Sequence, residues 1–180
     1  MTPPRLVPMG DSALRVELGD AIDADVNEAV MALAHAVASA RFPGVQDIVP
    51  TYKSVAIYFD PLRTDYGEMV ERVMNDASKP RPASIAASAR VLRVPVCYEK
   101  PHALDLEAVA AWAGMSEEEV VRLHTTGAYR VFMLGFTPGF GYMGTVDDRI
   151  AIPRLATPRT RVPAGSVGIA GGQTGIYPSE

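Results

Sequence analysis

The chain has few cysteines, no long apolar run and no excess of positive charge, which are the features of disulfide-rich, membrane-spanning and nucleic-acid-binding proteins. It contains a single cysteine, Cys97, which excludes an internal disulfide framework and fits a reducing cytosol. Nowhere do about 18 apolar residues run together, and the opening MTPPRLVPMGDS has no apolar signal-peptide core. The formal net charge of −4 has the wrong sign for binding nucleic-acid phosphates. We therefore expect a cytoplasmic protein with no membrane span and no nucleic-acid partner.

Motifs for metals, nucleotides and nucleophiles are missing or incomplete. His35, His102 and His124 are scattered, and no H-x-x-x-H or C-x-x-C pair occurs, so we expect no metal site in this chain. No G-x-x-x-x-G-K-[ST] loop is present. The G-x-G-x-x-G at 139–144 precedes TVDDRIAIPR, which lacks the helix that a dinucleotide fold needs. Ser166 resembles an elbow nucleophile, but no helix can follow it, so we interpret it as a turn or strand residue.

The first 80 residues carry alternating signals of strands and helices. Apolar residues recur at helical spacing between positions 22 and 40, and Asp65 with Glu68 is close to a capping box. The order ββαββα predicts a small two-layer α/β domain over residues 1–80, with helices on one sheet face. The expected elements are strands at 5–9 and 12–18, a helix at 22–40, a hairpin of strands at 45–49 and 54–59, and a helix at 66–77.

A change of composition marks the boundary of a second domain. Residues 78–90, SKPRPASIAASAR, are rich in proline, serine and alanine, which is typical of a linker. We place the linker at 81–90 and the second domain at 91–180, opening with a strand at Leu92–Tyr98. The caps and ends of two short helices are expected at Asp105, Gly114, Ser116 and Gly127. From Tyr129 onward the pattern is strand and loop, so this domain is predicted to be mostly β.

The stretch 129–177 holds most of the glycines, and no regular helix fits it. Residues 129–134 are apolar and aromatic, as a buried strand would be. Next come glycines 135, 139, 141 and 144, alternating with Phe136, Phe140 and Tyr142, and with Pro138 between them. Glycine allows positive φ and close approach of a ligand, while the rings supply apolar walls. This loop is therefore predicted to shape a binding surface.

Four arginines crowd into one segment of an otherwise acidic chain: Arg149, Arg154, Arg159 and Arg161. Arginine forks match carboxylate or phosphate groups. Prolines 153, 158 and 163 stiffen the segment, which lowers the entropy lost on binding. We predict that Arg154 and Arg159 hold an anion. The alternative is a solvated loop with salt bridges.

Two further features of the second domain have competing interpretations. Gln173 and Thr174 follow Gly171-Gly172, which either presents backbone N–H groups as an anion nest or makes a plain tight turn between strands. His124, at a helix end shortly before Tyr129, is either a cation that favours the helix dipole or a group for proton transfer. It is the only histidine near the glycine-rich stretch.

These residues resemble the KipI/allophanate hydrolase subunit 1 family, which includes the B subunit of the prokaryotic ATP-dependent 5-oxoprolinase. The resemblance is carried by GDSALRVELG at 10–19, His124, LGFTPGFGYMG at 134–144 and IPRLATPRTRVPAGSVGIAGGQTGIYP at 152–178. It implies an α+β fold, with a small α/β domain followed by a cyclophilin-like β-barrel. It also implies a partner of the KipA/allophanate hydrolase subunit 2 type and a second of the LamB/YcsF type. The sequence has no Met-Lys pair for biotin attachment, so any biotin is expected on another chain.

The resemblance implies a subunit of an enzyme that converts 5-oxo-L-proline, ATP and water to L-glutamate, ADP and phosphate. ATP, with any accompanying Mg²⁺, is expected to bind with the partner subunit. Family chains continue with a Ser-Pro-Gly-Gly-Trp block, whereas this one stops at Glu180. We therefore expect a barrel without its last strands, inactive alone. The alternatives are a histidine-kinase inhibitor and a carboxyltransferase component of a urea carboxylase-type system.

The predicted site consists of one acid/base residue and a set of small-molecule contacts. His124 is the catalytic candidate. The predicted substrate-binding residues are Gly135, Phe136, Pro138, Gly139, Phe140, Tyr142, Arg154, Arg159, Pro163, Gly165, Gln173 and Thr174.

Overall fold

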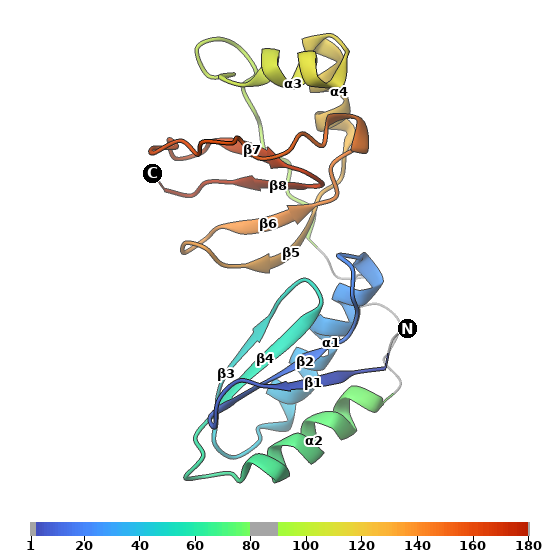
Figure 1. The fold of residues 1–180 in the computed structure, drawn as a ribbon, viewed down its shortest axis with the longest axis vertical. Helices are drawn as coiled ribbons and strands as arrows, with labels where there is room; N and C mark the ends of the chain where they lie inside the picture. Colours follow the sequence, from blue (N-terminus) through green and yellow to red (C-terminus); the bar gives the residue numbers. More distant parts are fainter. Residues whose placement is uncertain (1–2, 80–89, 180) are drawn as a thin grey trace. The chain divides into compact units, whose positions relative to one another are not determined.

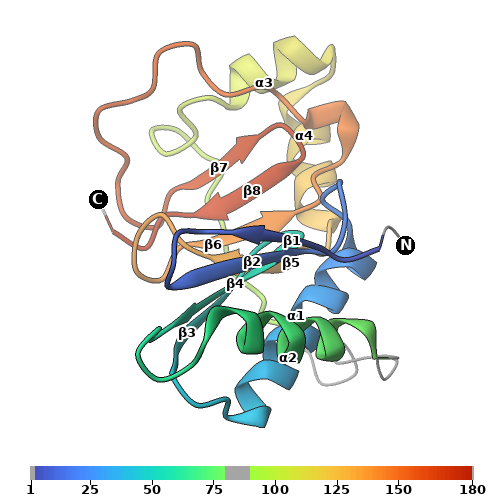
Figure 2. The ribbon, with the colours of Figure 1, turned by 60° about the horizontal axis from the view of Figure 1, so that its bottom comes forward.

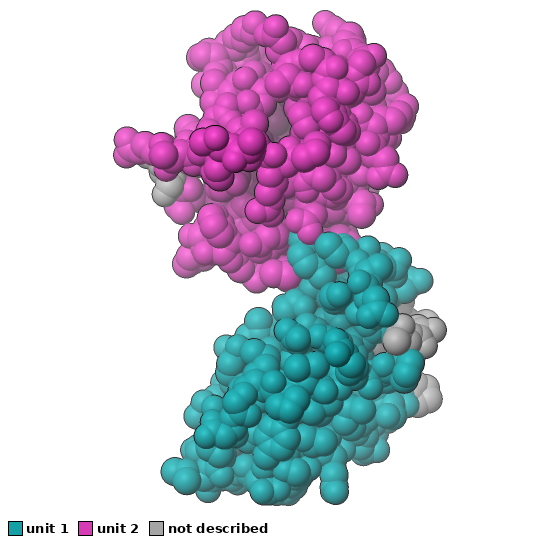
Figure 3. Space-filling model, in the orientation of Figure 1, with its two compact units in different colours: residues 1–91 teal, residues 92–180 magenta. Residues whose placement is uncertain are grey.

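The computed structural model describes residues 3–79 and 90–179, and the chain divides into two compact units, Met1–Val91 and Leu92–Glu180 (Figures 1 and 3). Apart from Arg90, the predicted linker 81–90 lies outside the described residues. Each unit has a hydrophobic core of its own. Within the described residues, no helix has the length and apolar character needed to cross a bilayer.

The first unit is a four-stranded antiparallel sheet in the order β1-β2-β4-β3, packed against two helices (Figure 2). The central strands bury Leu14 opposite Ile57 and Val16 opposite Val55. Both helices contribute to the same core as these strands, so both cover one face of the sheet. The elements are β1 (Arg5–Pro8), β2 (Ala13–Glu17), α1 (Ala24–Ala40), β3 (Val45–Pro50), β4 (Ser54–Phe59) and α2 (Tyr66–Ser78).

Helix starts in the first unit follow their capping residues. The Asp23 carboxylate accepts hydrogen bonds from the N–H groups of Asp25 and Val26, so α1 begins two residues later than its apolar pattern predicts. The Asp65 carboxylate caps α2 in the same way. The element order β1-β2-α1-β3-β4-α2 confirms the predicted ββαββα order.

The second unit contains another four-stranded antiparallel sheet, in the order β5-β6-β8-β7. Two α-helices and the 3₁₀ helix η2 pack together beside it around Val120, Leu123 and Ile150 (Figure 1). The elements are α3 (Leu106–Ala113), α4 (Glu117–Thr126), β5 (Arg130–Leu134), β6 (Gly141–Gly144), η2 (Asp148–Ile150), β7 (Val167–Ala170) and β8 (Gln173–Ile176).

Two expectations for the second unit need correction. The described part of the unit forms an open sheet whose edges are β5 and β7, and not a closed barrel. Residues 92–98 form no strand, although their sequence favours one, because their backbone pairs with no other described strand. Leu92 and Val94 consequently remain exposed.

The predicted helix boundaries in this unit are mostly correct. Gly114 ends α3 in the left-handed conformation, at φ 65°, and the Ser116 hydroxyl accepts from the N–H of Glu119 at the start of α4. Gly127 ends α4. Asp105 stands at the N-cap position of α3, but its side chain makes no capping hydrogen bond.

Candidate functional site

The loop between β5 and β6 is held by its own backbone. The N–H of Gly135 donates to the carbonyl of Phe140 (3.2 Å), and the N–H of Phe140 donates to the carbonyl of Thr137 (3.0 Å). Pro138 and Gly139, the latter at φ 86°, occupy the two central positions of this turn, as a type II turn requires. Pro138 and Gly139 were predicted to contact substrate, and in the structure they set the conformation of this turn.

Aromatic rings gather around this loop. Phe140 is 8% exposed and packs edge-on against Phe136 (5.6 Å between centroids), Tyr142 (5.0 Å) and Tyr177 (5.3 Å). Phe136 is 77% exposed and has a positive φ of 69°, which is rare for a residue with a side chain. The three rings predicted to form an apolar wall thus lie together, and Tyr177 joins them. Sequence reasoning missed Tyr177, although it stands in the quoted QTGIYP run.

A glycine of β8 makes room for the central ring. A Cβ added to Gly175 would lie 2.5 Å from the end of the Phe140 ring, closer than real Cβ contacts come. A Cβ added to Gly135 would lie 3.6 Å from the Tyr142 ring, which is an ordinary contact distance. Glycine is required at 175 so that the sheet can receive the ring, and not for an unusual backbone angle.

The four clustered arginines do not share one partner. The Arg149 guanidinium pairs with Asp147 (2.7 Å), and its hydrogen bonds lower the pKa of that carboxyl to about 2. The Arg159 guanidinium donates instead to Asp105, 2.7 Å away at the start of α3. Arg154 is exposed and forms no ion pair with the described residues. The structure thus supports the salt-bridge interpretation for two of the arginines.

The loop between η2 and β7, residues 151–166 (the arginine loop), carries three of the clustered arginines. It ends in a turn that leads into β7. The N–H of Ser166 donates to the carbonyl of Pro163, and the N–H of Gly165, at φ 83°, donates to the carbonyl of Tyr177. Pro163 and Gly165 were predicted to contact substrate. In the structure Pro163 begins this turn, and Gly165 ties the turn to Tyr177 directly after β8, in the aromatic cluster.

The glycine pair before β8 forms the tight turn between β7 and β8. The N–H of Gly171 already donates to the carbonyl of Ile152, so it is not open to an anion. The Thr174 hydroxyl is buried and donates to the Gly168 carbonyl (2.9 Å). Thr174 was predicted to contact substrate, and in the structure its hydroxyl is engaged within the sheet. Gln173 is half-buried, with its backbone paired in the sheet.

His124 lies in a buried cluster with two tyrosines. Its Nδ1 is 2.5 Å from the Tyr98 hydroxyl, its ring packs 5.2 Å from that of Tyr129, and the Tyr129 hydroxyl donates to its carbonyl. Burial lowers the pKa of His124 and raises that of Tyr98. These shifts favour the neutral form of both side chains near pH 7 and disfavour the interpretation of His124 as a helix-end cation. Nε2 is buried and has no hydrogen-bond partner among the described residues.

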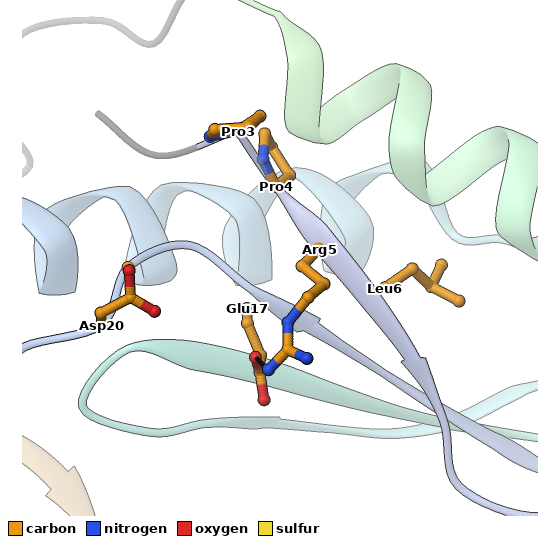
Figure 4. A pocket seen from close by; sticks show the side chains of 7 residues that line it. Pro3, Pro4, Arg5, Leu6, Glu17 and Asp20 are labelled. Atoms are coloured by element: carbon orange, nitrogen blue, oxygen red, sulfur yellow. Dashed lines mark hydrogen bonds and ion pairs between the residues drawn. The ribbon is translucent and has the colours of Figure 1, made fainter.

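A surface hollow occurs in the first unit, which contains none of the predicted site residues. It is lined by Pro3, Pro4, Arg5, Leu6, Glu17, Gly19 and Asp20 (Figure 4). Glu17 pairs with both Arg5 and Arg15, and the hydrogen bond from Arg5 lowers its pKa. Because the Glu17 carboxylate and the two guanidinium groups neutralise one another, this hollow is a weak candidate for binding a charged ligand. No group of three or more histidine, cysteine or acidic side chains that could hold a metal ion occurs in residues 3–79 and 90–179.

Comparisons with known proteins agree with this architecture. The family of carboxyltransferase domains, subdomains C and D, matches residues 4–180, and the chain belongs to it. Among curated proteins it is 41% identical to the B subunit of 5-oxoprolinase from Bacillus subtilis, over 94% of this chain and 75% of that one. It is 35% identical to the corresponding B subunit of Escherichia coli O157:H7, over 94% of this chain and 76% of that one. The resemblance stated from the sequence is therefore confirmed.

Solved structures support the fold. The crystal structure of TTHA0988 aligns with a TM-score of 0.79 at 37% identity, over 93% of this chain and 32% of that one. The chain therefore spans about a third of that protein's length. The urea carboxylase of Kluyveromyces lactis aligns with a TM-score of 0.72, over 98% of this chain and 18% of that one. At 17% identity, this second likeness concerns the fold alone.

Proposed function

We propose that this chain is a subunit of an ATP-dependent 5-oxoprolinase, which converts 5-oxo-L-proline, ATP and water to L-glutamate, ADP and phosphate. The observation that carries the proposal is the 41% identity to the B subunit of a 5-oxoprolinase over nearly the whole chain. Its partners in the proposal are a subunit of the KipA/allophanate hydrolase subunit 2 type and one of the LamB/YcsF type. ATP and its Mg²⁺ bind with the partner, and this chain alone is inactive.

The aromatic cluster is the proposed apolar wall for the cyclic amide. Phe136 and Tyr142, backed by the buried ring of Phe140, present ring surface beside a turn of fixed conformation, which suits the CH₂ groups of a small cyclic amide. Arg154 and Arg159 hold the substrate carboxylate or a phosphate group, because a guanidinium favours either oxyanion. Gln173 orients the amide oxygen in this scheme.

His124 remains the proposed general acid/base. A Tyr98 hydroxyl that donates to Nδ1 leaves the ring proton of neutral His124 on Nε2. Nε2 is then the nitrogen that would exchange a proton with substrate, and it has no competing partner among the described residues. Since it is buried, substrate must reach it through a rearrangement of the surrounding side chains.

Co-expression with both presumptive partner subunits tests the proposal. The assembled complex should release glutamate and ADP in equal amounts from 5-oxoproline and ATP, and the isolated chain should release neither. A stable complex that hydrolyses ATP without 5-oxoproline, or that carboxylates urea in the presence of a biotin carrier, would contradict it. The second outcome would favour the carboxyltransferase alternative.

Phe136 also favours a second candidate function, the inhibition of a histidine kinase through protein docking. A ring that is 77% exposed on a turn of fixed conformation is the type of anchor that protein interfaces use. In this case the isolated chain should suppress autophosphorylation of a sensor kinase at stoichiometric concentration. The oxoprolinase proposal expects no such effect.

A further inference from the structure

The ion pair between Arg159 and Asp105 differs from the others in the second unit. It joins residues 54 positions apart, and so ties the middle of the arginine loop to the start of α3. Two other ion pairs of this unit, Arg122–Glu119 and Arg149–Asp147, are local contacts between near neighbours. The contact with Asp105 is therefore a tertiary contact, and it engages an arginine proposed to bind an anion.

Asp105 occupies a capping position without capping. At the other N-caps of α-helices in the described residues, the side chains of Asp23, Asp65 and Ser116 accept hydrogen bonds from the first helical N–H groups. The Asp105 side chain accepts none of these hydrogen bonds, and its carboxylate accepts one from the Arg159 guanidinium instead. Helix capping therefore does not explain the orientation of this carboxylate.

The contact has the properties of one that a ligand can replace. The Arg159 and Asp105 side chains are 35% and 49% exposed, and ion pairs of this kind are weak. A single N–H···O hydrogen bond joins them, whereas a guanidinium can hold a free oxyanion through two. Residues 153–160 make no backbone hydrogen bond with the described backbone, so this part of the loop can shift without breaking a sheet.

We propose that Asp105 is a built-in competitor for the oxyanion site at Arg159 and sets its affinity and selectivity. Its carboxylate lies on the Arg159 guanidinium, in the place that a substrate carboxylate or a phosphate group would take. Anions that bind through two oxygens displace it, and weaker ones do not. The inference rests on the anion-holding role given to Arg159 in the proposed function, and adds a specificity-determining residue to that site.

The test measures anion binding by the full 180-residue chain, without partner subunits, by NMR titration. Separate titrations with inorganic phosphate and with 5-oxoproline distinguish a phosphate site from a carboxylate site. Asp105→Asn should tighten binding of the preferred anion roughly two- to five-fold, the range expected from removing one exposed ion pair. Asparagine is as good an N-cap as aspartate, so α3 should stay intact. Asp147→Asn, which breaks the pair with Arg149, is the matched control and should leave the affinity unchanged.

A double-mutant cycle decides whether the gain acts through Arg159. Arg159→Ala should weaken binding, and adding Asp105→Asn to it should bring no further change. The proposal is overturned if Asp105→Asn binds as the original chain or more weakly, if the double variant gains as much as the single one, or if Arg159→Ala binds normally. These results are independent of turnover, so an assembled complex with no oxoprolinase activity would refute the proposed function and leave the competition measurable.

Discussion

The close contact between Gly175 and Phe140 predicts a large cost for adding one methyl group. In Gly175→Ala, the new Cβ would lie 2.5, 3.1 and 3.3 Å from three atoms of the Phe140 ring. The ring cannot turn aside freely, because it is 8% exposed and packed against three other rings. Overpacking of this kind typically costs about 1–3 kcal/mol. For a unit of this size, that lowers the midpoint of thermal unfolding by about 5 to 20 °C.

The single tryptophan makes the measurement specific to the second unit. Trp112 lies in α3, so its fluorescence during urea or thermal unfolding reports on the unit that contains Gly175. Gly172→Ala is the matched control: its added Cβ meets nothing within 4 Å, and we expect a change below about 0.5 kcal/mol. Replacing Phe140 by leucine should reduce the cost of alanine at 175. Equal stability of Gly175→Ala and the original chain would refute the steric argument.

Two further predictions concern buried polar groups of the same unit. Thr174→Val removes the hydroxyl that donates to the Gly168 carbonyl and should lower the free energy of unfolding by about 1–3 kcal/mol in the Trp112 assay, while Thr174→Ser keeps most of it. Burial lowers the pKa of His124 below its ordinary 6.5, so the unfolded chain takes up this proton first as the pH falls. The free energy of unfolding should therefore be undiminished by His124 above pH 6.5 and should decrease below it, until the His124 of the folded state is protonated too. His124→Gln should flatten that decrease, and an unchanged pH profile would contradict the assignment.

The first unit could be predicted almost completely because its signals are local. The helical spacing of apolar residues, the cap Asp65 and the strand alternation around Leu14 all act within one or two turns of chain. The apolar spacing predicts the start of α1 two residues too early, because it takes no account of the cap Asp23. The same holds for the turn at Pro138-Gly139, whose two residues have the backbone preferences that a type II turn needs.

Contacts between distant parts of the second unit were not predictable in this way. Residues 92–98 have the composition of a strand, but a strand exists only where another backbone supplies its hydrogen bonds, and none of the described residues does so. The aromatic character of the loop was readable from its composition. Its packing on Tyr177 and Gly175 depends on how β6 and β8 pair.

The chemistry of the side chains, too, is decided partly by the sequence and partly by the tertiary structure. The sequence alone identifies Arg159 as a guanidinium suited to bind an oxyanion. It also identifies His124 as the one histidine near the glycine-rich stretch. Folding then brings Asp105 to Arg159 across 54 positions and encloses His124 between Tyr98 and Tyr129. Charge state and partner depend on burial and on distance in space, and these follow from the packing of the whole unit rather than from neighbours along the chain.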